Sequence, residues 1–200
     1  MNATLISTIG PPGCGKTTLA TNLARALGGQ FIAEPFANNP FLSDAYRGRA
    51  QARLPAQLQF LLLRVGQLDR HTWPAGGLFV SDYGFCQDRL FARAQLSSEE
   101  FALYDPIRER LEPHVHPPEL LILLDVPETE LLRRIAARGR EFEQGITFDF
   151  LTDMRARYRQ AAAEASCPVL RVENHTVDLR DPAAVAALAA EVRKQSGLSL

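Results

Sequence analysis

The sequence contains a glycine-rich segment that ends in a lysine and two threonines, the pattern of a phosphate-binding loop. It comprises Gly10, Pro11, Pro12, Gly13, Cys14, Gly15, Lys16, Thr17 and Thr18, a full match to G-x-x-x-x-G-K-S/T. In such a loop backbone N–H groups surround phosphate oxygens, the lysine reaches the β- and γ-phosphates, and the hydroxyl after it coordinates Mg²⁺. An apolar run precedes the loop and a helical pattern follows it, so we expect it to bind ATP with Mg²⁺.

Three acidic residues each follow a short apolar segment that we predict to be a strand. Glu34 comes directly after the second such segment, where its carboxylate could accept the proton of an attacking hydroxyl. Asp82 follows the third and Asp125 the fourth, and a carboxylate at such a position can hold Mg²⁺ or its water shell. The residue types leave both open, and we favour Asp82, together with Thr17, for the metal.

A basic segment near residue 140 predicts a second phosphate-binding element. Arg134 and Arg138 are four residues apart and share one face of a predicted helix, and Gly139 ends that helix just before Arg140. Arginine presents a fork of N–H donors to phosphate oxygens and keeps its charge. We expect a flexible lid at about residues 134–146 that closes over the transferring phosphoryl group; the alternative is a solvated basic helix end.

Five short apolar segments alternate with longer segments of helical periodicity. The predicted strands are Thr4–Ile9, Phe31–Ala33, Leu78–Ser81, Leu120–Leu124 and Val169–Val172. The predicted helices are Lys16–Leu27, Leu54–His71, Ser98–Leu111, Glu128–Arg138, Phe150–Ala165 and Pro182–Gln195. This alternation predicts an α/β fold with a five-stranded parallel sheet flanked by helices, and ligands bound beyond the carboxyl ends of the strands.

The composition bounds the class of protein. The 200 residues carry 22 basic and 23 acidic side chains, a formal charge of −1, and 46% of them are hydrophobic. These values suit one globular domain over residues 1–200 and argue against a coat for nucleic acid or an anionic membrane. No run approaches about 18 apolar residues, no secretory leader is evident, and the three cysteines lack metal-type spacing. We expect a cytoplasmic protein with no nucleic-acid or membrane partner.

In their order and spacing these motifs resemble the deoxynucleoside kinase family, which includes bacterial deoxyadenosine and deoxyguanosine kinases and animal deoxycytidine kinase. The resemblance extends from the phosphate loop to about Tyr158. After that loop its most specific part is the lid pattern R-I-x-x-R-G-R-x-x-E-Q-G-I, which matches Arg134 through Ile146. It implies a P-loop kinase fold, ATP with Mg²⁺ as donor, a deoxynucleoside as acceptor, and a homodimer formed through the apolar helix Leu54–His71.

The resemblance also implies roles for residues on the sugar side of the acceptor. Glu34, in an E-P-F segment, would bind the sugar 5′-hydroxyl and act as the base. Tyr46 and Glu143 would contact the 3′-hydroxyl. With the phosphate-loop lysine and the lid, the predicted catalytic set is Glu34, Lys16, Arg134, Arg138 and Arg140.

On the base side, the resemblance implies that Gln57 contacts the base edge and that Arg64 pairs with Asp88 to discriminate among bases. Gln57 and Arg64 are seven residues apart, so they share one side of a helix. A glutamine amide offers both a donor and an acceptor to neighbouring groups of a base. This set favours a purine deoxynucleoside, with deoxycytidine next and thymidine least.

The chain departs from the family pattern at two positions. Tyr83 stands where relatives carry an arginine that grips the 5′-hydroxyl and the phosphate, so we expect Arg89, Arg93 or a lid arginine to substitute. Ala52 stands near the place of a family tryptophan, which leaves the base preference open. The aromatic side chains that either sandwich the base or pack in the core are Phe36, Phe85 and Phe91.

Two other functions fit parts of the sequence. A nucleoside monophosphate kinase or another small-metabolite kinase shares the phosphate loop and the basic lid, but a carboxylate at Glu34 would repel a phosphate acceptor. An ATP-gated binding or regulatory protein needs neither a lid nor a proton acceptor. Both features therefore favour a kinase that acts on a neutral alcohol.

Overall fold

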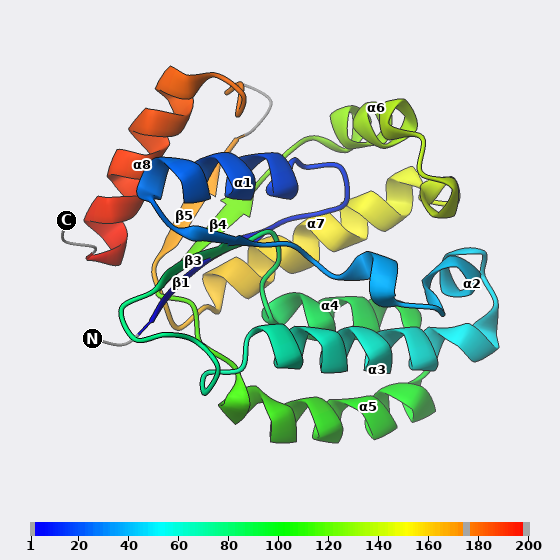
Figure 1. The fold of residues 1–200 in the computed structure, drawn as a ribbon. Helices are drawn as coiled ribbons and strands as arrows, with labels where there is room; N and C mark the ends of the chain where they lie inside the picture. The colour runs from blue at the N-terminus through cyan, green and yellow to red at the C-terminus, as the bar shows by residue number, and fades with distance from the viewer. Residues whose placement is uncertain (1–2, 174–176, 198–200) are drawn as a thin grey trace.

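The computed structural model describes residues 3–173 and 177–197, which form a parallel sheet flanked by helices (Figure 1). The strands are β1 (Thr4–Ile9), β2 (Gln30–Ile32), β3 (Leu78–Ser81), β4 (Leu120–Leu124) and β5 (Val169–Val172), which pair in the order β2-β3-β1-β4-β5. The helices are α1 (Lys16–Leu27), α2 (Leu42–Tyr46), α3 (Ala50–Gln67), α4 (Cys86–Gln95), α5 (Ser98–Leu111), α6 (Glu128–Arg138), α7 (Phe148–Ala163) and α8 (Pro182–Ser196). Short 3₁₀ turns cover Phe36–Asn38, Glu112–His114 and Glu141–Glu143. All strand pairs are parallel, so the predicted fold class is confirmed.

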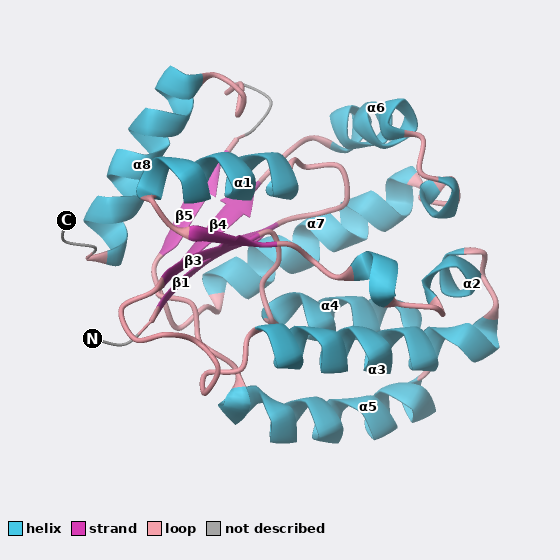
Figure 2. Ribbon diagram, in the orientation of Figure 1, coloured by secondary structure: helices cyan, strands magenta, loops and turns pink. Residues whose placement is uncertain are grey.

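The helices form a layer on each face of the sheet (Figures 1 and 2). On one face, α1 and α8 pack against each other. On the other, α7 covers β4, α4 packs against α7, and α3 and α5 extend this layer outward. None of the helices within residues 3–173 and 177–197 is both long and apolar enough to span a membrane.

Strand β4 shows why the sheet lies at the centre of the core. Its five residues are all leucine or isoleucine, and each is at most 4% exposed. Successive side chains of a strand point to opposite faces, so Ile122 packs in the cluster with α1 while Leu121 and Leu123 pack in the cluster with α7. Both faces are therefore buried, and the polar residues that follow the strands gather at the carboxyl edge of the sheet.

Several predicted boundaries differ from the observed ones. Helix α3 begins at Ala50, one turn before the predicted start, and ends at Gln67. The prediction placed Pro55 in the first helical turn, where its missing N–H is tolerated, whereas the helix accommodates it in the second turn. Helix α7 begins two residues early because the Thr147 side chain accepts a hydrogen bond from the backbone N–H of Phe150. Strand β2 is one residue earlier than predicted.

Two helices, α2 and α4, were not predicted. Helix α2 has only five residues, too few for a periodic pattern. Helix α4 buries Gln87, Asp88 and Ala92, so two of its three buried residues are polar, although Leu90, Phe91 and Ala94 also pack against the core. Gln87 and Asp88, the buried polar residues of α4, lie in or next to the candidate site.

Candidate active site

A cavity of about 800 Å³ lies at the carboxyl edge of the sheet. The phosphate loop, the residues after β2 and β3, helices α2, α3, α4 and α7, and the end of α6 all contribute to its walls. Most of the predicted site residues line it, namely Pro12, Gly13, Gly15, Lys16, Thr17, Thr18, Glu34, Tyr46, Gln57, Arg64, Asp82, Arg134, Arg138, Arg140 and Glu143. Gly10, Pro11, Cys14 and Asp88 do not appear among the lining residues.

The phosphate loop has a backbone that only glycine adopts without strain at three positions. Gly10, Gly13 and Gly15 have φ values of +147°, +83° and +100°. At Gly10 a Cβ atom would also lie 2.6 Å from the carbonyl oxygen of Leu124, so the loop approaches the end of β4 closely. Gly15 is the N-cap residue of α1 and provides no side-chain cap, which leaves the N–H groups of the first helical turn available to an anion.

Lys16 lies folded against its own loop. Its Nζ donates to the carbonyl oxygens of Gly10 at 2.7 Å and Pro11 at 3.2 Å. The Cys14 thiol lies beneath it and is fully buried, and this burial raises the pKa of the thiol. The ammonium group is thus held at the cavity by neutral carbonyls, which leave its charge available to phosphate oxygens.

Asp82 links the phosphate loop to the residue proposed as the base. Its Oδ2 accepts a hydrogen bond from the Thr17 hydroxyl at 2.6 Å, and its Oδ1 accepts one from the backbone N–H of Glu34 at 2.6 Å. Burial raises the pKa of Asp82, and the Thr17 hydrogen bond opposes that effect. A hydroxyl beside a carboxylate is an oxygen donor set of the kind that Mg²⁺ prefers, so these two side chains fit the metal.

Asp125 lies in a different environment. It accepts hydrogen bonds from Arg155 at 2.6 Å, Arg159 at 2.8 Å and Arg171 at 2.5 Å, and it does not line the cavity. Burial would raise its pKa, but the hydrogen bonds from Arg159 and Arg155 outweigh burial and lower it. Three guanidinium groups already occupy this carboxylate, which makes it a poor ligand for a metal.

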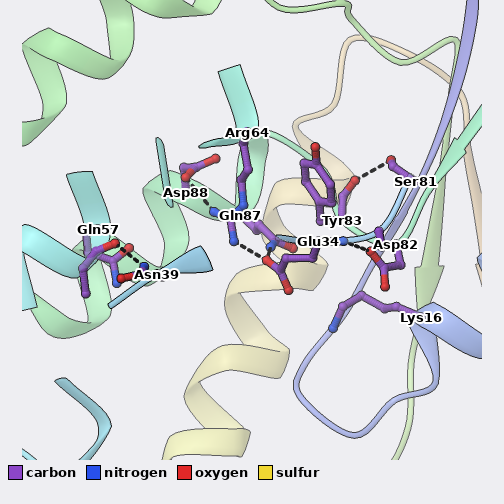
Figure 3. A network of polar contacts seen from close by, with 12 residues as sticks. Lys16, Glu34, Asn39, Gln57, Arg64, Ser81, Asp82, Tyr83, Gln87 and Asp88 are labelled. Atoms are coloured by element: carbon purple, nitrogen blue, oxygen red, sulfur yellow. Dashed lines mark hydrogen bonds and ion pairs between the residues drawn. The ribbon is translucent and has the colours of Figure 1, made fainter. Parts of the chain in front are cut away.

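Glu34 occupies the centre of a polar network in the cavity (Figure 3). Its Oε1 accepts a hydrogen bond from Gln87 Nε2 at 2.5 Å and forms an ion pair with the Arg64 guanidinium. Pairing of β2 with β3 fixes the backbone before it, since the Asp82 N–H donates to the carbonyl of Ile32 at 3.1 Å. The carboxylate is 23% exposed, so a ligand in the cavity can reach it.

Arg64 is shared between two carboxylates. Its Nη1 donates to Asp88 Oδ1 at 2.6 Å, and its Nη2 contacts Glu34. Burial opposes the charge on Arg64, but attraction by Asp88 and Glu34 outweighs burial and raises the guanidinium pKa. Asp88 is fully buried behind Arg64, so the predicted pairing of the two is observed, and Asp88 reaches the cavity only through Arg64.

The amide of Gln57 is oriented by a neighbour on α4. Gln57 Nε2 donates to Gln95 Oε1 at 2.9 Å, which leaves Gln57 Oε1 as an acceptor. That oxygen is buried and has no hydrogen-bond partner among the described residues. A buried acceptor without a partner is unfavourable, and a donor on a bound ligand would satisfy it.

The lid arginines line the cavity, and each is paired with a glutamate. Arg134 Nε donates to Glu130 at 2.6 Å, Arg138 binds Glu143 with contacts of 2.5 to 3.0 Å, and Arg140 lies 3.6 Å from Glu143. Helix α6 ends at Gly139 in the left-handed conformation, as the sequence predicted. Glu143 is only 5% exposed, so it holds two arginines together at the edge of the cavity.

An aromatic cluster joins the lid to the side of the cavity formed by α2. Phe142 packs edge-on against Tyr46, with ring centroids 5.6 Å apart, and lies 6.1 Å from Phe36. The Arg140 guanidinium stacks over the Phe36 ring at 4.5 Å. Burial raises the pKa of Tyr46, and the charge of Glu34 adds to this effect. Tyr46 therefore remains a neutral hydroxyl donor in the cavity.

Some candidate side chains lie away from the cavity, and Phe85 takes the core position that the sequence left open. Phe85 packs in an apolar cluster beneath the Arg108 guanidinium and does not line the cavity, unlike Phe36 and Phe91. Arg89 pairs with Asp105 at 2.6 Å and Arg93 stacks over Phe101, so neither substitutes for an arginine at position 83. The two point away because they lie on the face of α4 that packs against α5.

Tyr83 also lies outside the cavity. Its side chain is buried, and its hydroxyl donates to Gln67 Oε1 at 2.8 Å. Its ring instead supports Arg64, whose guanidinium carbon lies 5.6 Å from the ring centroid. The Tyr83 ring thus acts as a platform for Arg64.

Sequence reasoning missed several lining residues. They are Gln87 and Gln95 on α4, Phe60 on α3, Phe142 in the lid, and residues 177–180 before α8. Gln87 directly precedes Asp88, so a prediction of helix α4 would have drawn attention to it. The others carry no signal of their own, because only the folded chain brings them to the cavity.

Comparisons with known proteins identify the family of the chain. Residues 6–194 match the deoxynucleoside kinase family. The chain is 30% identical over 184 residues to the deoxyguanosine kinase of Bacillus subtilis, covering 88% of this chain and 89% of that protein. It is 29% identical to the deoxyadenosine/deoxycytidine kinase of the same organism, covering 88% and 84%.

The fold agrees as well. A solved structure of deoxyadenosine kinase from M. mycoides, with the products dCMP and a flexible dCDP bound, superposes with a TM-score of 0.81. It covers 96% of this chain and 99% of that one at 18% identity, so the likeness concerns the fold. Taken with the family match over residues 6–194, these findings establish that the chain belongs to the deoxynucleoside kinase family.

Proposed function

We propose that this deoxynucleoside kinase transfers the γ-phosphoryl group of ATP, with Mg²⁺, to the 5′-hydroxyl of a 2′-deoxynucleoside. The observation that carries the proposal is the link from Thr17 through Asp82 to Glu34, with 2.6 Å at each step. It brings the Thr17 hydroxyl and the carboxylates of Asp82 and Glu34 to a single cavity, which supports a metal site beside a proton acceptor. Donor phosphates and acceptor hydroxyl can therefore meet there.

The reaction asks the protein mainly to position groups and to stabilise charge. Glu34 accepts the proton of the 5′-hydroxyl as its oxygen attacks the γ-phosphorus. Lys16 and the N–H groups at the start of α1 hold the phosphates. Mg²⁺, when bound, would supply further positive charge to stabilise them. Thr17 and Asp82 would hold the metal, Asp82 partly through water. Described His, Cys, Asp and Glu side chains form no group of three or more that could bind a metal, which suits an ion held mainly by phosphate.

The lid supplies three guanidinium groups. Arg134, Arg138 and Arg140 line the cavity beside the phosphate loop. We infer that they turn toward the transferring phosphoryl group, while Glu143 and Tyr46 bind the sugar 3′-hydroxyl. Glu143 pairs with both Arg138 and Arg140. A sugar that binds Glu143 would therefore also fix the positions of these two arginines.

For the base, we propose a purine first and cytosine second. Gln57 Oε1 is a buried acceptor, and an exocyclic amino group would satisfy it. Adenine, guanine and cytosine carry such a group and thymine lacks it. Arg64, held by Asp88, adds donors that can meet guanine O6 or N7, or cytosine O2 or N3. Phe36 and Phe91 supply ring faces in the cavity wall.

We also propose a homodimer formed by α3 and α5, which lie side by side (Figure 1). On α3, Leu61 is buried, whereas Leu62 is 57% exposed. On α5, Leu103 and Ile107 are 64% and 44% exposed. Large apolar side chains exposed together on neighbouring helices favour contact with another protein surface, and a second copy of the chain would cover them.

A cytoplasmic location completes the proposal. Cys86 and Cys167 are free thiols. Burial raises the pKa of Cys86 to about 12 and also raises that of Cys167. Free thiols are typical of proteins that work in a reducing compartment.

The test is release of ADP with each of the four deoxynucleosides, with deoxynucleoside monophosphates, and without acceptor. We expect turnover only with deoxynucleosides, a higher kcat/KM for deoxyadenosine or deoxyguanosine than for deoxycytidine, and the lowest for thymidine. A preference for monophosphates would favour the monophosphate kinase, and acceptor-independent hydrolysis would favour the ATP-gated protein. A preference for thymidine would contradict the base assignment alone.

A further inference from the structure

Gln87 reaches Glu34 from α4, the helix that the sequence did not reveal. Its side chain is 1% exposed, and its Nε2 donates a hydrogen bond to Glu34 Oε1 at 2.5 Å. Figure 3 shows Gln87 beside Glu34, next to the Arg64 guanidinium that bridges Glu34 and Asp88. Gln87 thus contacts the residue proposed to take the proton.

A second contact fixes which end of the Gln87 amide faces Glu34. The Tyr158 hydroxyl, on α7, donates to Gln87 Oε1 at 3.3 Å. Burial raises the pKa of Tyr158 well above its ordinary value, so this hydroxyl keeps its proton. With its oxygen accepting from Tyr158, the amide presents its NH₂ group to the carboxylate.

The two contacts to Glu34 converge on one of its oxygens. Gln87 and Arg64 both donate to Oε1, and within residues 3–173 and 177–197 no group donates to Oε2. A single donor would let the carboxylate rotate about Oε1. Two donors from different helices hold the carboxylate in one orientation. Oε2 is thereby left as the oxygen that can accept a proton.

The charges around Glu34 explain why a neutral donor suits this position. Arg64 already compensates Asp88, which is buried, at 2.6 Å. A second cation beside Glu34 would weaken its ability to take a proton, and another carboxylate would repel it. The amide of Gln87 orients the carboxylate and adds no charge.

We propose that Gln87 is a positioning residue, held by Tyr158, that turns the carboxylate of Glu34 so that Oε2 faces the acceptor hydroxyl. This inference rests on the proposed role of Glu34 as proton acceptor. Gln87 itself does not touch the reacting atoms. Its effect should therefore fall on turnover and should require an intact Glu34.

The first experiment measures kcat and KM for the preferred deoxynucleoside in Gln87→Leu, a substitution of similar volume. We expect kcat to fall about 10- to 100-fold, the size expected for a lost hydrogen bond to a charged group. KM should change less than about 3-fold, because binding does not depend on the orientation of the carboxylate. Gln160→Leu is the matched control, since Gln160 is an exposed glutamine on α7 that bonds only Glu164 in the described structure. Its kcat should be unchanged.

The second experiment repeats the substitution in the Glu34→Gln background. If Gln87 acts through Glu34, the added substitution lowers kcat by less than about 2-fold there. An equal fall in both backgrounds, or a normal kcat in Gln87→Leu while Glu34→Gln is crippled, would overturn the inference and leave the proposed function standing. Near-normal turnover of Glu34→Gln would instead remove the proton acceptor, and the inference with it.

A third variant decides the matter if Gln87→Leu does not fold, which thermal denaturation would show. Tyr158→Phe removes only the hydroxyl that orients the amide. We expect kcat to fall about 3- to 10-fold, the effect of a neutral hydrogen bond, and only when Glu34 is present. Unchanged turnover in a folded Tyr158→Phe enzyme would contradict the positioning role.

Discussion

The hydroxyl of Thr17 and the carboxylate of Asp82 lie in direct contact, with 2.6 Å between Oγ1 and Oδ2. The two residues come from the first turn of α1 and the end of β3, which are 65 residues apart in the chain. Parallel strands end at the same edge of a sheet, so β1 and β3 bring the phosphate loop and Asp82 together. This contact favours Asp82 over Asp125 as the metal carboxylate.

A magnesium titration of two variants tests that choice. Asp82→Asn removes the negative charge beside Thr17, so we expect it to lower kcat and to raise the Mg²⁺ concentration required for half-maximal turnover. Asp125→Asn should leave both values close to those of the unaltered enzyme, because Asp125 is bound by Arg155, Arg159 and Arg171. The assignment fails if only Asp125→Asn changes the metal requirement.

Asp125→Asn should affect stability instead. The carboxylate side chain is 1% exposed and compensates three arginines, of which Arg159 and Arg171 are about half exposed. Removing its charge leaves the arginines to repel one another, and we expect the free energy of unfolding to fall by about 1 to 3 kcal/mol. Urea denaturation near pH 7 measures this. An unchanged midpoint would show that solvent screens the cluster.

The same variant makes a prediction about acid. The arginines lower the pKa of Asp125 in the folded protein, so the stabilisation is complete above the unfolded pKa of about 3.9. It is lost as the pH falls below that value through the lower folded-state pKa. The difference in unfolding free energy between the unaltered protein and Asp125→Asn should be constant at neutral pH and shrink below about pH 4. A difference that grows on acidification would contradict this.

Lid arginines should act on turnover more than on nucleoside binding. Arg138→Ala removes a guanidinium from the cavity wall and releases Glu143, so we expect kcat to fall about 10²- to 10³-fold, as for other lost charge-stabilising donors. KM for the nucleoside should rise less, and steady-state kinetics separates the two. Arg157→Ala is the control, since Arg157 pairs with Asp153 on α7 away from the cavity. Equal losses in both variants would indicate general damage.

The proposed dimer can be broken at its apolar surface. Leu62→Asp together with Leu103→Asp places two charges on the exposed faces of α3 and α5. We expect light scattering to report about twice the chain mass for the unaltered protein and the mass of one chain for the variant. If the unaltered protein has the mass of one chain, the proposed dimer is contradicted.

The sequence predicted the sheet well, because its strands are buried and apolar. All five strands of the sheet occupy nearly the predicted residues, and the lid helix ends at Gly139 as expected. Most of the site residues that were predicted from motifs and their spacing line one cavity. These features depend on local patterns that a single sequence carries.

The features that the sequence did not reveal depend on contacts between distant segments. Asp82 and Asp125 both follow strands, and their contacts distinguish them: Asp82 accepts from Thr17, whereas Asp125 is bound by Arg155 and Arg159 of α7. Helix α4 was missed because it turns Gln87 and Asp88 inward. In a sequence, a polar side chain is expected at the surface. Only the structure shows that Gln87 and Asp88 are buried, because it shows their partners Glu34 and Arg64.

The turnover of Glu34→Gln tests the central claim most directly. The amide keeps the size of the side chain and can still bind a hydroxyl, but it cannot take a proton. We predict nearly normal binding of the deoxynucleoside, measured by calorimetry, with kcat lowered about 10²- to 10⁴-fold, as for loss of a general base. A variant that binds the deoxynucleoside and turns over at nearly the normal rate would contradict the account.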